Sequence, residues 1–149
     1  MSDVSLRPAT AADAPVLARV AHASFHQAFA GIMSAAALAQ RPLPFFVERF
    51  GVQWPQVVVA ERAGRIVGFS MVRERHIDML FVDPGAQARG VGKVLLDGCE
   101  AGGAITLECF RDNRQARDFY EKHGWKLTQS LRRAFCGEDY DFVLYAKGA

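Results

Sequence analysis

Apolar residues recur at helical spacing in the first third of the chain. Asp13 opens an amphipathic helix and Gly31 ends it. The apolar face of this helix consists of Val16, Leu17, Val20, Phe25 and Phe29. The residues from Ala35 to Gln40 favour another short helix, and those from Phe45 to Phe50 favour a further helical turn or two. Helices should therefore dominate the chain up to about residue 50.

Runs of alternating or β-branched apolar residues predict the strands. In order, these runs are Val4–Arg7, Val57–Glu61, Arg65–Val72, Ile77–Val82, Ala104–Cys109, Trp125–Leu131 and Tyr140–Ala146. Gly64 lies between the second and third runs and favours a hairpin there, because glycine readily adopts the positive φ of a tight turn. Helices are predicted at 91–101 and at 113–123, the second ended by Gly124. This order predicts a mixed α/β sheet of six or seven strands.

Composition and charge narrow the class of protein. The chain has 149 residues, of which 50% are hydrophobic and 23% charged, as expected for a single domain over 1–149. The net charge of +2 is spread along the chain, so neither nucleic acid nor a membrane is indicated as a partner. The first ten residues lack the apolar core of a signal peptide, and no apolar run approaches the roughly 18 residues of a transmembrane helix. We therefore expect a cytoplasmic protein.

The cysteines do not suggest a disulfide framework or a metal site. Cys99, Cys109 and Cys136 are odd in number and widely spaced. Metal chelation commonly uses a Cys-x-x-Cys spacing, which is absent. Reduced, mostly buried thiols and no metal are the expectation.

The segment from Gln87 to Gly92 lies between a predicted strand and the start of a predicted helix. Free backbone N–H groups and the positive end of the helix dipole meet there, so such a loop can bind an anion. Gly90 and Gly92 allow close approach to the main chain, and Arg89 and Lys93 add positive charge. The spacing matches neither a P-loop nor a dinucleotide-binding turn, which disfavours nucleotide hydrolysis and hydride transfer. Two glycines can also form only a tight turn before a helix, but a pyrophosphate fits this loop.

Two motifs carry a resemblance to a known family. Val82-Asp-Pro, followed by Gln-x-x-Gly-x-Gly and Val94-Leu-Leu, resembles the cofactor motif of the GNAT superfamily of N-acetyltransferases. The segment from Asn113 to Trp125 resembles that family's second signature, with Trp125 where phenylalanine is usual. The opening Leu6-Arg-Pro-Ala-Thr with Asp13 is also similar to the family's common start. The motifs occur in the family's order, so the resemblance runs from the N-terminus to Trp125.

The resemblance implies a GNAT-like α+β fold: a mixed, mostly antiparallel sheet of six or seven strands with about four flanking helices. It implies acetyl-CoA as co-substrate. In similar enzymes, loop amides hold the CoA pyrophosphate, and the preceding strand pairs with the pantetheine arm. Asn113 would point toward that arm, although asparagine there is also a common helix N-cap. The positions that carry over as cofactor-binding are Leu80, Phe81, Val82, Gln87, Ala88, Arg89, Gly90, Val91, Gly92, Lys93, Asn113 and Tyr120.

The catalytic roles also follow from the resemblance. Tyr120 stands where the family places a phenol that protonates the departing thiolate, a role suited to a donor of high pKa. From helix periodicity alone, Tyr120 would be only a buried aromatic. His76 and Asp78 match positions where some members carry a base, and a histidine could accept a proton near neutral pH while Asp78 orients it or binds a cationic substrate. Ordinary polar roles for both are an equal alternative.

Other polar residues near these strands are weaker candidates. Glu108 and Asp112 are alternative bases, and Phe81 could supply a main-chain donor to the oxyanion. Cys109 could be mistaken for a covalent acyl carrier, but direct transfer needs none.

The acceptor side is less clearly defined. Phe25 and Phe29 are candidates for substrate contact, with His26, Phe45 and Phe135 in the same regions, although Phe25 and Phe29 also have the spacing of core residues. We expect an enzyme that acetylates a primary amine of a small molecule. Protein or peptide acetylation and a catalytically silent CoA-binding sensor remain alternatives. Exposed strands near the C-terminus are compatible with a homodimer.

Overall fold

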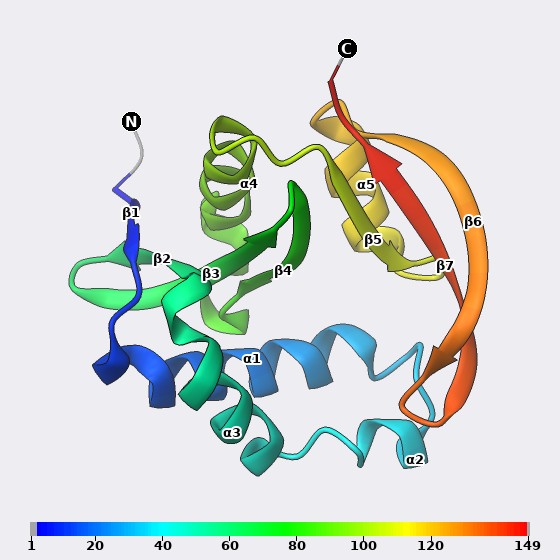
Figure 1. Ribbon diagram of the computed structural model, residues 1–149, viewed down its shortest axis with the longest axis horizontal. Helices are drawn as coiled ribbons and strands as arrows, with labels where there is room; N and C mark the ends of the chain where they lie inside the picture. Colours follow the sequence, from blue (N-terminus) through cyan, green and yellow to red (C-terminus); the bar gives the residue numbers. More distant parts are fainter. Residues whose placement is uncertain (1–2, 149) are drawn as a thin grey trace.

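The computed structural model describes residues 3–148, apart from the side chains of residues 87–89. A seven-stranded sheet in the order β1-β2-β3-β4-β5-β7-β6 carries helices on both faces (Figure 1). The strands are β1 (Ser5–Pro8), β2 (Val57–Arg62), β3 (Arg65–Arg73), β4 (His76–Val82), β5 (Thr106–Phe110), β6 (Lys126–Phe135) and β7 (Glu138–Ala146). The α-helices are α1 (Ala14–Phe29), α2 (Ala35–Leu38), α3 (Leu43–Gln53), α4 (Val91–Ala101) and α5 (Arg114–Lys122). Short 3-10 helices are η1 (Ala11–Asp13), η2 (Trp54–Gln56) and η3 (Pro84–Arg89).

The predicted mixed, mostly antiparallel sheet is confirmed, since only β4 and β5 pair in parallel. Several elements are longer than predicted, α3 and β6 by the most. α3 begins at Leu43, before the predicted turn, and β6 continues past Leu131 to Phe135. β6 pairs only with β7 and is mostly exposed, so its outer half contains Arg132 and Arg133 and lacks the apolar alternation on which the prediction relied. No helix in the described residues is long and apolar enough to cross a membrane.

The sheet separates two apolar layers. On one face, Phe25 of α1 and Phe50 of α3 belong to the same cluster as Phe69 of β3. On the other face, Leu96 of α4 and Tyr120 of α5 pack with the β5 and β7 side chains. Figure 1 shows α1 running beneath both halves of the sheet, from the β1–β2 side toward β6 and β7. This helix therefore joins two halves that are only weakly paired to each other.

Among the described strands, the two halves of the sheet are connected only by the short β4–β5 pairing. These strands pair only at His76 with Thr106 and Ile77 with Leu107, after which both continue without each other. A register shift against β3 leaves Asp78 as the extra residue of a β-bulge, which bends the strand. Ile77 and Met79 consequently pack in opposite layers, although they are two residues apart. The bend and the divergence open a gap in the middle of the sheet.

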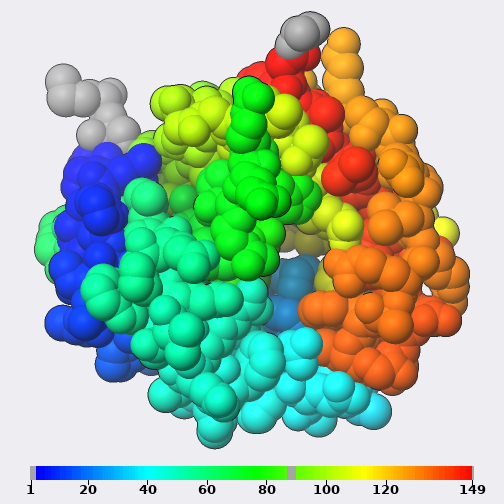
Figure 2. Space-filling view, viewed as in Figure 1, coloured from blue at the N-terminus to red at the C-terminus, as the bar shows by residue number. Residues whose placement is uncertain are grey.

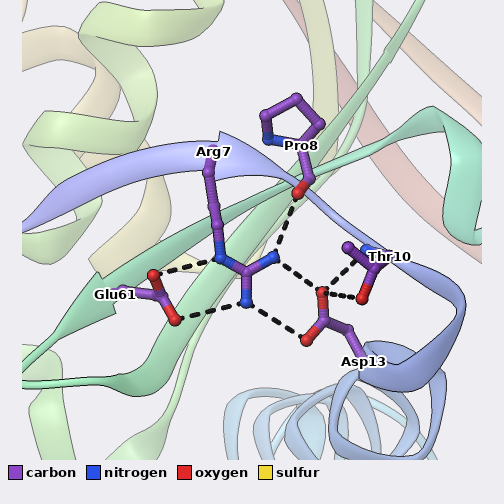
Figure 3. Close-up of polar contacts among 5 residues, drawn as sticks. All are labelled: Arg7, Pro8, Thr10, Asp13 and Glu61. Atoms are coloured by element: carbon purple, nitrogen blue, oxygen red, sulfur yellow. Dashed lines mark hydrogen bonds and ion pairs between the residues drawn. The ribbon is translucent and has the colours of Figure 1, made fainter.

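A compact ion network holds the N-terminus to the sheet (Figure 3). The Arg7 guanidinium donates to Asp13 at 2.8 Å and also contacts Glu61 of β2 at 3.0 Å. Asp13 accepts a second hydrogen bond, at 2.7 Å, from the amide of Thr10. The hydrogen bond from Arg7, more than that from Thr10, lowers the pKa of Asp13 to about 2. The network links β1, β2 and the start of α1.

Candidate active site

A cavity of about 800 Å³ occupies the gap between β4 and β5. Figure 2 shows the molecule hollowed between teal α3, cyan α2 and orange β6–β7, with blue α1 at the bottom of the hollow. Residues of α1, α3, β4, β5 and α5 line the cavity, together with the end of β6 and Phe142 of β7. Its aromatic lining residues include Phe25, Phe29, Phe45, Phe46, Phe110, Phe119, Tyr120, Phe135 and Phe142. The cavity therefore draws on segments from the whole length of the chain.

One end of the cavity lies at the start of α4. Gly90 is the N-cap in a left-handed conformation, with φ of 77°, and no side chain caps the helix. A Cβ on Gly90 would meet nothing within 4 Å, whereas one on Gly92 would lie 3.3 Å from the Phe119 ring. No described side chain thus accepts from the first-turn amides, and the space beside Gly90 is open. This geometry fits an anionic group such as a pyrophosphate.

The other loop residues predicted to bind the cofactor lie in different surroundings. Gly90, Gly92 and Lys93 line the cavity, but Lys93 also forms an exposed ion pair with Asp97 at 2.8 Å. Val91 is fully buried, so only its main chain can face a ligand. The predicted side chains that fall outside the described part of the structure are those of Gln87, Ala88 and Arg89.

The unpaired length of β4 forms one wall. Leu80, Phe81 and Val82 all line the cavity, and β5 pairs with none of them. The buried hydroxyl of Ser24, on α1, donates to the Val82 carbonyl at 2.8 Å. That bond fixes α1 against the strand and uses one of the carbonyl's two lone pairs. The remaining main-chain groups on this edge are available to an extended ligand.

α5 supplies the opposite wall. Asn113 is its N-cap and accepts a hydrogen bond from the Ala116 amide at 3.1 Å, as predicted. Asn113 also lines the cavity, so its capping role leaves it beside a ligand. Tyr120 lies one helical turn from Ala116 and also borders the cavity, although it is only 9% exposed. Burial, reinforced by Cys109 and Cys99, raises the pKa of Tyr120. The phenol is therefore held neutral.

The two candidate bases border the cavity at the point where the strands part. His76 Nδ1 lies 2.8 Å from the Thr106 hydroxyl on β5, whereas the Asp78 carboxylate pairs with Arg73 on β3. The structure thus gives the two side chains different partners, because the bulge turns Asp78 toward β3. Asp78 does not orient His76 in this arrangement; Thr106 holds the imidazole instead.

Comparison with known proteins identifies the family. A family model described as an acetyltransferase (GNAT) domain matches residues 21–143. The chain belongs to the GNAT acetyltransferase family. Membership makes it an N-acetyltransferase and implies acetyl-CoA as the acetyl donor. This agrees with the uncapped start of α4 from Gly90 to Lys93, called the α4 cradle below, and with the unpaired edge of β4.

Individual relatives differ in the acceptor that their names state. The peptidyl-lysine N-acetyltransferase YjaB of Escherichia coli is 34% identical over 98 residues, which cover 65% of this chain and 67% of YjaB. The blasticidin-S acetyltransferase of Streptomyces morookaense is 33% identical over 76 residues, 48% of this chain and 56% of that protein. A GCN5-related N-acetyltransferase from Rhodopseudomonas palustris has a TM-score of 0.78 at 31% identity, covering 100% of this chain and 98% of its own.

The weaker candidates from the sequence, Cys109, Glu108 and Asp112, have different surroundings in the structure. Burial raises the pKa of the Cys109 thiol to about 12, which disfavours the thiolate that a covalent acyl carrier needs. Glu108 lines the cavity but is bound by Arg133, whose Nε lies 3.0 Å from its Oε1. Asp112 pairs with Arg111 at 3.1 Å on the surface and is 65% exposed. Asp112 is therefore a surface residue, and it is not among the residues that line the cavity.

Sequence reasoning missed three arginines of the GNAT cavity. Arg41, Arg49 and Arg133 line it from the α2–α3 connection, α3 and β6. Phe25 and Phe29, the predicted substrate contacts, line it too and also form part of the core. None of the three belongs to a sequence motif that marks it as part of a site. A clue was the position of Arg41 and Arg49 on either side of the Phe45-Phe46 pair.

Proposed function

We propose that this GNAT enzyme transfers an acetyl group from acetyl-CoA directly to a primary amine of a small molecule. The observation that supports the small acceptor is the lining of the cavity beyond the start of α4, where aromatic side chains from both halves of the fold face the same space. A pocket lined in this way is typical of a small-molecule site. An open groove along a sheet edge would suit a polypeptide better.

The donor would lie along the α4 cradle and the unpaired edge of β4. First-turn amides of α4, reached past Gly90 and Gly92, would hold the pyrophosphate, with Lys93 beside it. Main-chain groups of Leu80, Phe81 and Val82 would pair with the pantetheine arm, and Asn113 would lie close to it. Bound acetyl-CoA supplies a thioester carbonyl that a neutral amine can attack.

Two side chains would move the protons. Tyr120 stays neutral because it is buried, so it can donate its phenolic proton to a departing thiolate. If His76 Nδ1 donates to the Thr106 hydroxyl, Nε2 carries the free lone pair and can accept a proton from the incoming ammonium, directly or through water. Asp78, already paired with Arg73, would contribute negative charge near the amine. No step requires Cys109.

A second acceptor class has its own support. The similarity to YjaB, a peptidyl-lysine N-acetyltransferase by name, favours a lysine side chain reaching into the same cavity. A lysine side chain is a slender primary amine, so the aromatic walls do not exclude it. The two proposals differ in whether peptide on either side of the amine improves the reaction.

The deciding experiment measures CoA release over a panel of small amines and a library of lysine-containing peptides, after calorimetry with acetyl-CoA. We expect acetyl-CoA binding and turnover of free amines at least as fast as of peptides. Mass shifts confined to peptides would replace the small-molecule proposal with the peptidyl one. Absence of acetyl-CoA binding would contradict the cradle proposed at α4.

Replacement of Tyr120 tests the proton donor. Tyr120→Phe should lower kcat by about 100-fold or more and change acetyl-CoA affinity little, because it removes a proton donor and almost no binding surface. Tyr140→Phe is the matched control, since it removes the same atom from a tyrosine outside the cavity. Equal kcat for the two variants and the wild type would rule Tyr120 out as the acid.

A further inference from the structure

Two arginines of the cavity have no carboxylate partner among the described residues. Arg41 donates to the Gln40 carbonyl, and Arg49 donates to the Gln53 side chain at 2.9 Å. The third cavity arginine differs, because Arg133 is bound to Glu108. The end of the cavity beside α3 therefore contains two guanidinium groups whose charges no bound carboxylate balances.

The surroundings of Arg49 make its charge unfavourable in the empty enzyme. Burial lowers its pKa, Arg41 and Arg73 lower it further, and Asp78 alone opposes them. Asp78 is in turn engaged by Arg73. A half-buried guanidinium among like charges is stabilised by an anion that enters its pocket.

Arg41 is held in place by contacts that leave it able to bind an anion. Its guanidinium carbon lies 4.2 Å from the centre of the Phe45 ring and 5.4 Å from that of Phe135. The Arg41 carbonyl lies 2.7 Å from His26 Nε2, on α1. Aromatic contact engages the faces of a guanidinium and leaves donors in its plane free for a carboxylate. Arg41 is thus ordered before any ligand arrives.

Arg49 and Asp78 line the same cavity, which relates this charge to the reacting position. Asp78 follows directly after the last β4 residue that pairs with β5, so it lies where the gap between the strands begins. An anion bound by Arg49 would therefore lie close to the position that the acceptor amine must reach. A ligand that carries a carboxylate close to its amine is an amino acid or a close analogue of one.

We propose that the acceptor is an amino acid or a close analogue, whose carboxylate is held by Arg41 and Arg49. Its side chain is aromatic or large and apolar, because Phe29, Phe110 and Phe135 also line the cavity. This assignment rests on the small-molecule function proposed above. It names the substrate class of that site, and Arg41 and Arg49 as the residues that select it.

The test compares two amines that differ only in the carboxylate, phenylalanine and 2-phenylethylamine. With saturating acetyl-CoA, we expect kcat/KM for phenylalanine to exceed that for 2-phenylethylamine by about 10-fold or more. Arg41→Gln and Arg49→Gln should each remove most of this preference through KM for phenylalanine. The readout is the ratio of the two kcat/KM values, which should fall toward 1 in each variant.

The control is Arg19→Gln, the same change at an exposed arginine of α1 outside the cavity. Calorimetric titration of phenylalanine into the CoA complex gives a second readout, in which the two cavity variants should bind more weakly and the control should not. The wild-type comparison of the two amines needs no variant, so misfolding of a variant cannot hide the result.

The outcomes separate the two proposals. Equal or faster acetylation of 2-phenylethylamine would overturn the carboxylate site and leave the small-molecule function intact. An equal loss of kcat/KM for both amines in the arginine variants would overturn it as well, because the arginines would then not recognise the carboxylate. Acetylation of peptides alone, with both small amines inert, would overturn both proposals.

Discussion

Tyr120 and Cys109 share one buried environment, which affects their chemistry in opposite ways. Burial raises the pKa of each group because it disfavours the charged form. A phenol that stays neutral can donate a proton, whereas a thiol that stays neutral is a poor nucleophile. One physical cause therefore supports the proposed acid and argues against a covalent intermediate.

Removal of the Cys109 thiol tests this at the residue scale. Cys109→Ala should retain kcat within about twofold, because direct transfer uses no acyl-enzyme. Intact-mass measurement of the wild type during turnover should show no acetyl adduct. Cys136→Ala, a buried cysteine outside the cavity, is the control for packing loss. An adduct on Cys109, together with a large loss of turnover in its variant, would contradict direct transfer.

At the scale of elements, the ends of strands and helices create the site. β4 and β5 pair at two positions only, the bulge at Asp78 bends β4, and α4 starts without a side-chain cap. Each is a local defect in regular hydrogen bonding, and each leaves main-chain groups without a partner among the described residues. Such groups favour a ligand that supplies the missing acceptors and donors.

Gly90 allows a matched test of the α4 cradle. Gly90 and Gly64 both have positive φ, 77° and 76°, with nothing within 4 Å of an added Cβ. Replacing either by alanine should lower stability by about 1 kcal/mol through backbone strain. Only Gly90→Ala should weaken acetyl-CoA binding, by about 10-fold, because the strain displaces the amides that meet the pyrophosphate. Equal acetyl-CoA affinity in both variants, measured by calorimetry, would show that the cradle does not bind it.

At the scale of the molecule, the gap that forms the cavity also weakens the sheet, and contacts outside the sheet compensate. α1 packs against β3 and β4 and crosses to the far half, while the network around Arg7 fixes its start (Figure 3). The exposed edge strand β6 leaves the homodimer a prediction that solution scattering can test.

The Asp13 carboxylate should make the stability of the whole fold depend on pH. Its folded pKa of about 2 lies below the usual value near 3.9 of an unfolded chain. Its contribution is therefore complete above about pH 4 and disappears as the pH falls toward 2. Asp13→Asn should cost about 1 kcal/mol at pH 7, and urea titrations should show that difference shrinking between pH 4 and 2. A difference that is constant with pH would contradict the ion pair with Arg7.

Local patterns determined much of the architecture. Helical periodicity located α1, alternation located most strands, and the glycines marked the end of α5 and the start of α4, because these signals depend on residues close together in the chain. The outer part of β6 was not predicted, because an exposed edge strand needs no apolar alternation. The two GNAT motifs indicated the family, and the family match confirms it.

The tertiary structure alone decided which side chains meet. His76 meets Thr106, not Asp78, because a one-residue bulge redirects the strand, and no pattern in the sequence announces that bulge. Arg41 and Arg49 come to line the same cavity as Asp78 only when α3 folds against it. Sequence determines elements through short-range periodicity, whereas a site depends on contacts between distant segments, and those contacts exist only once the core has packed.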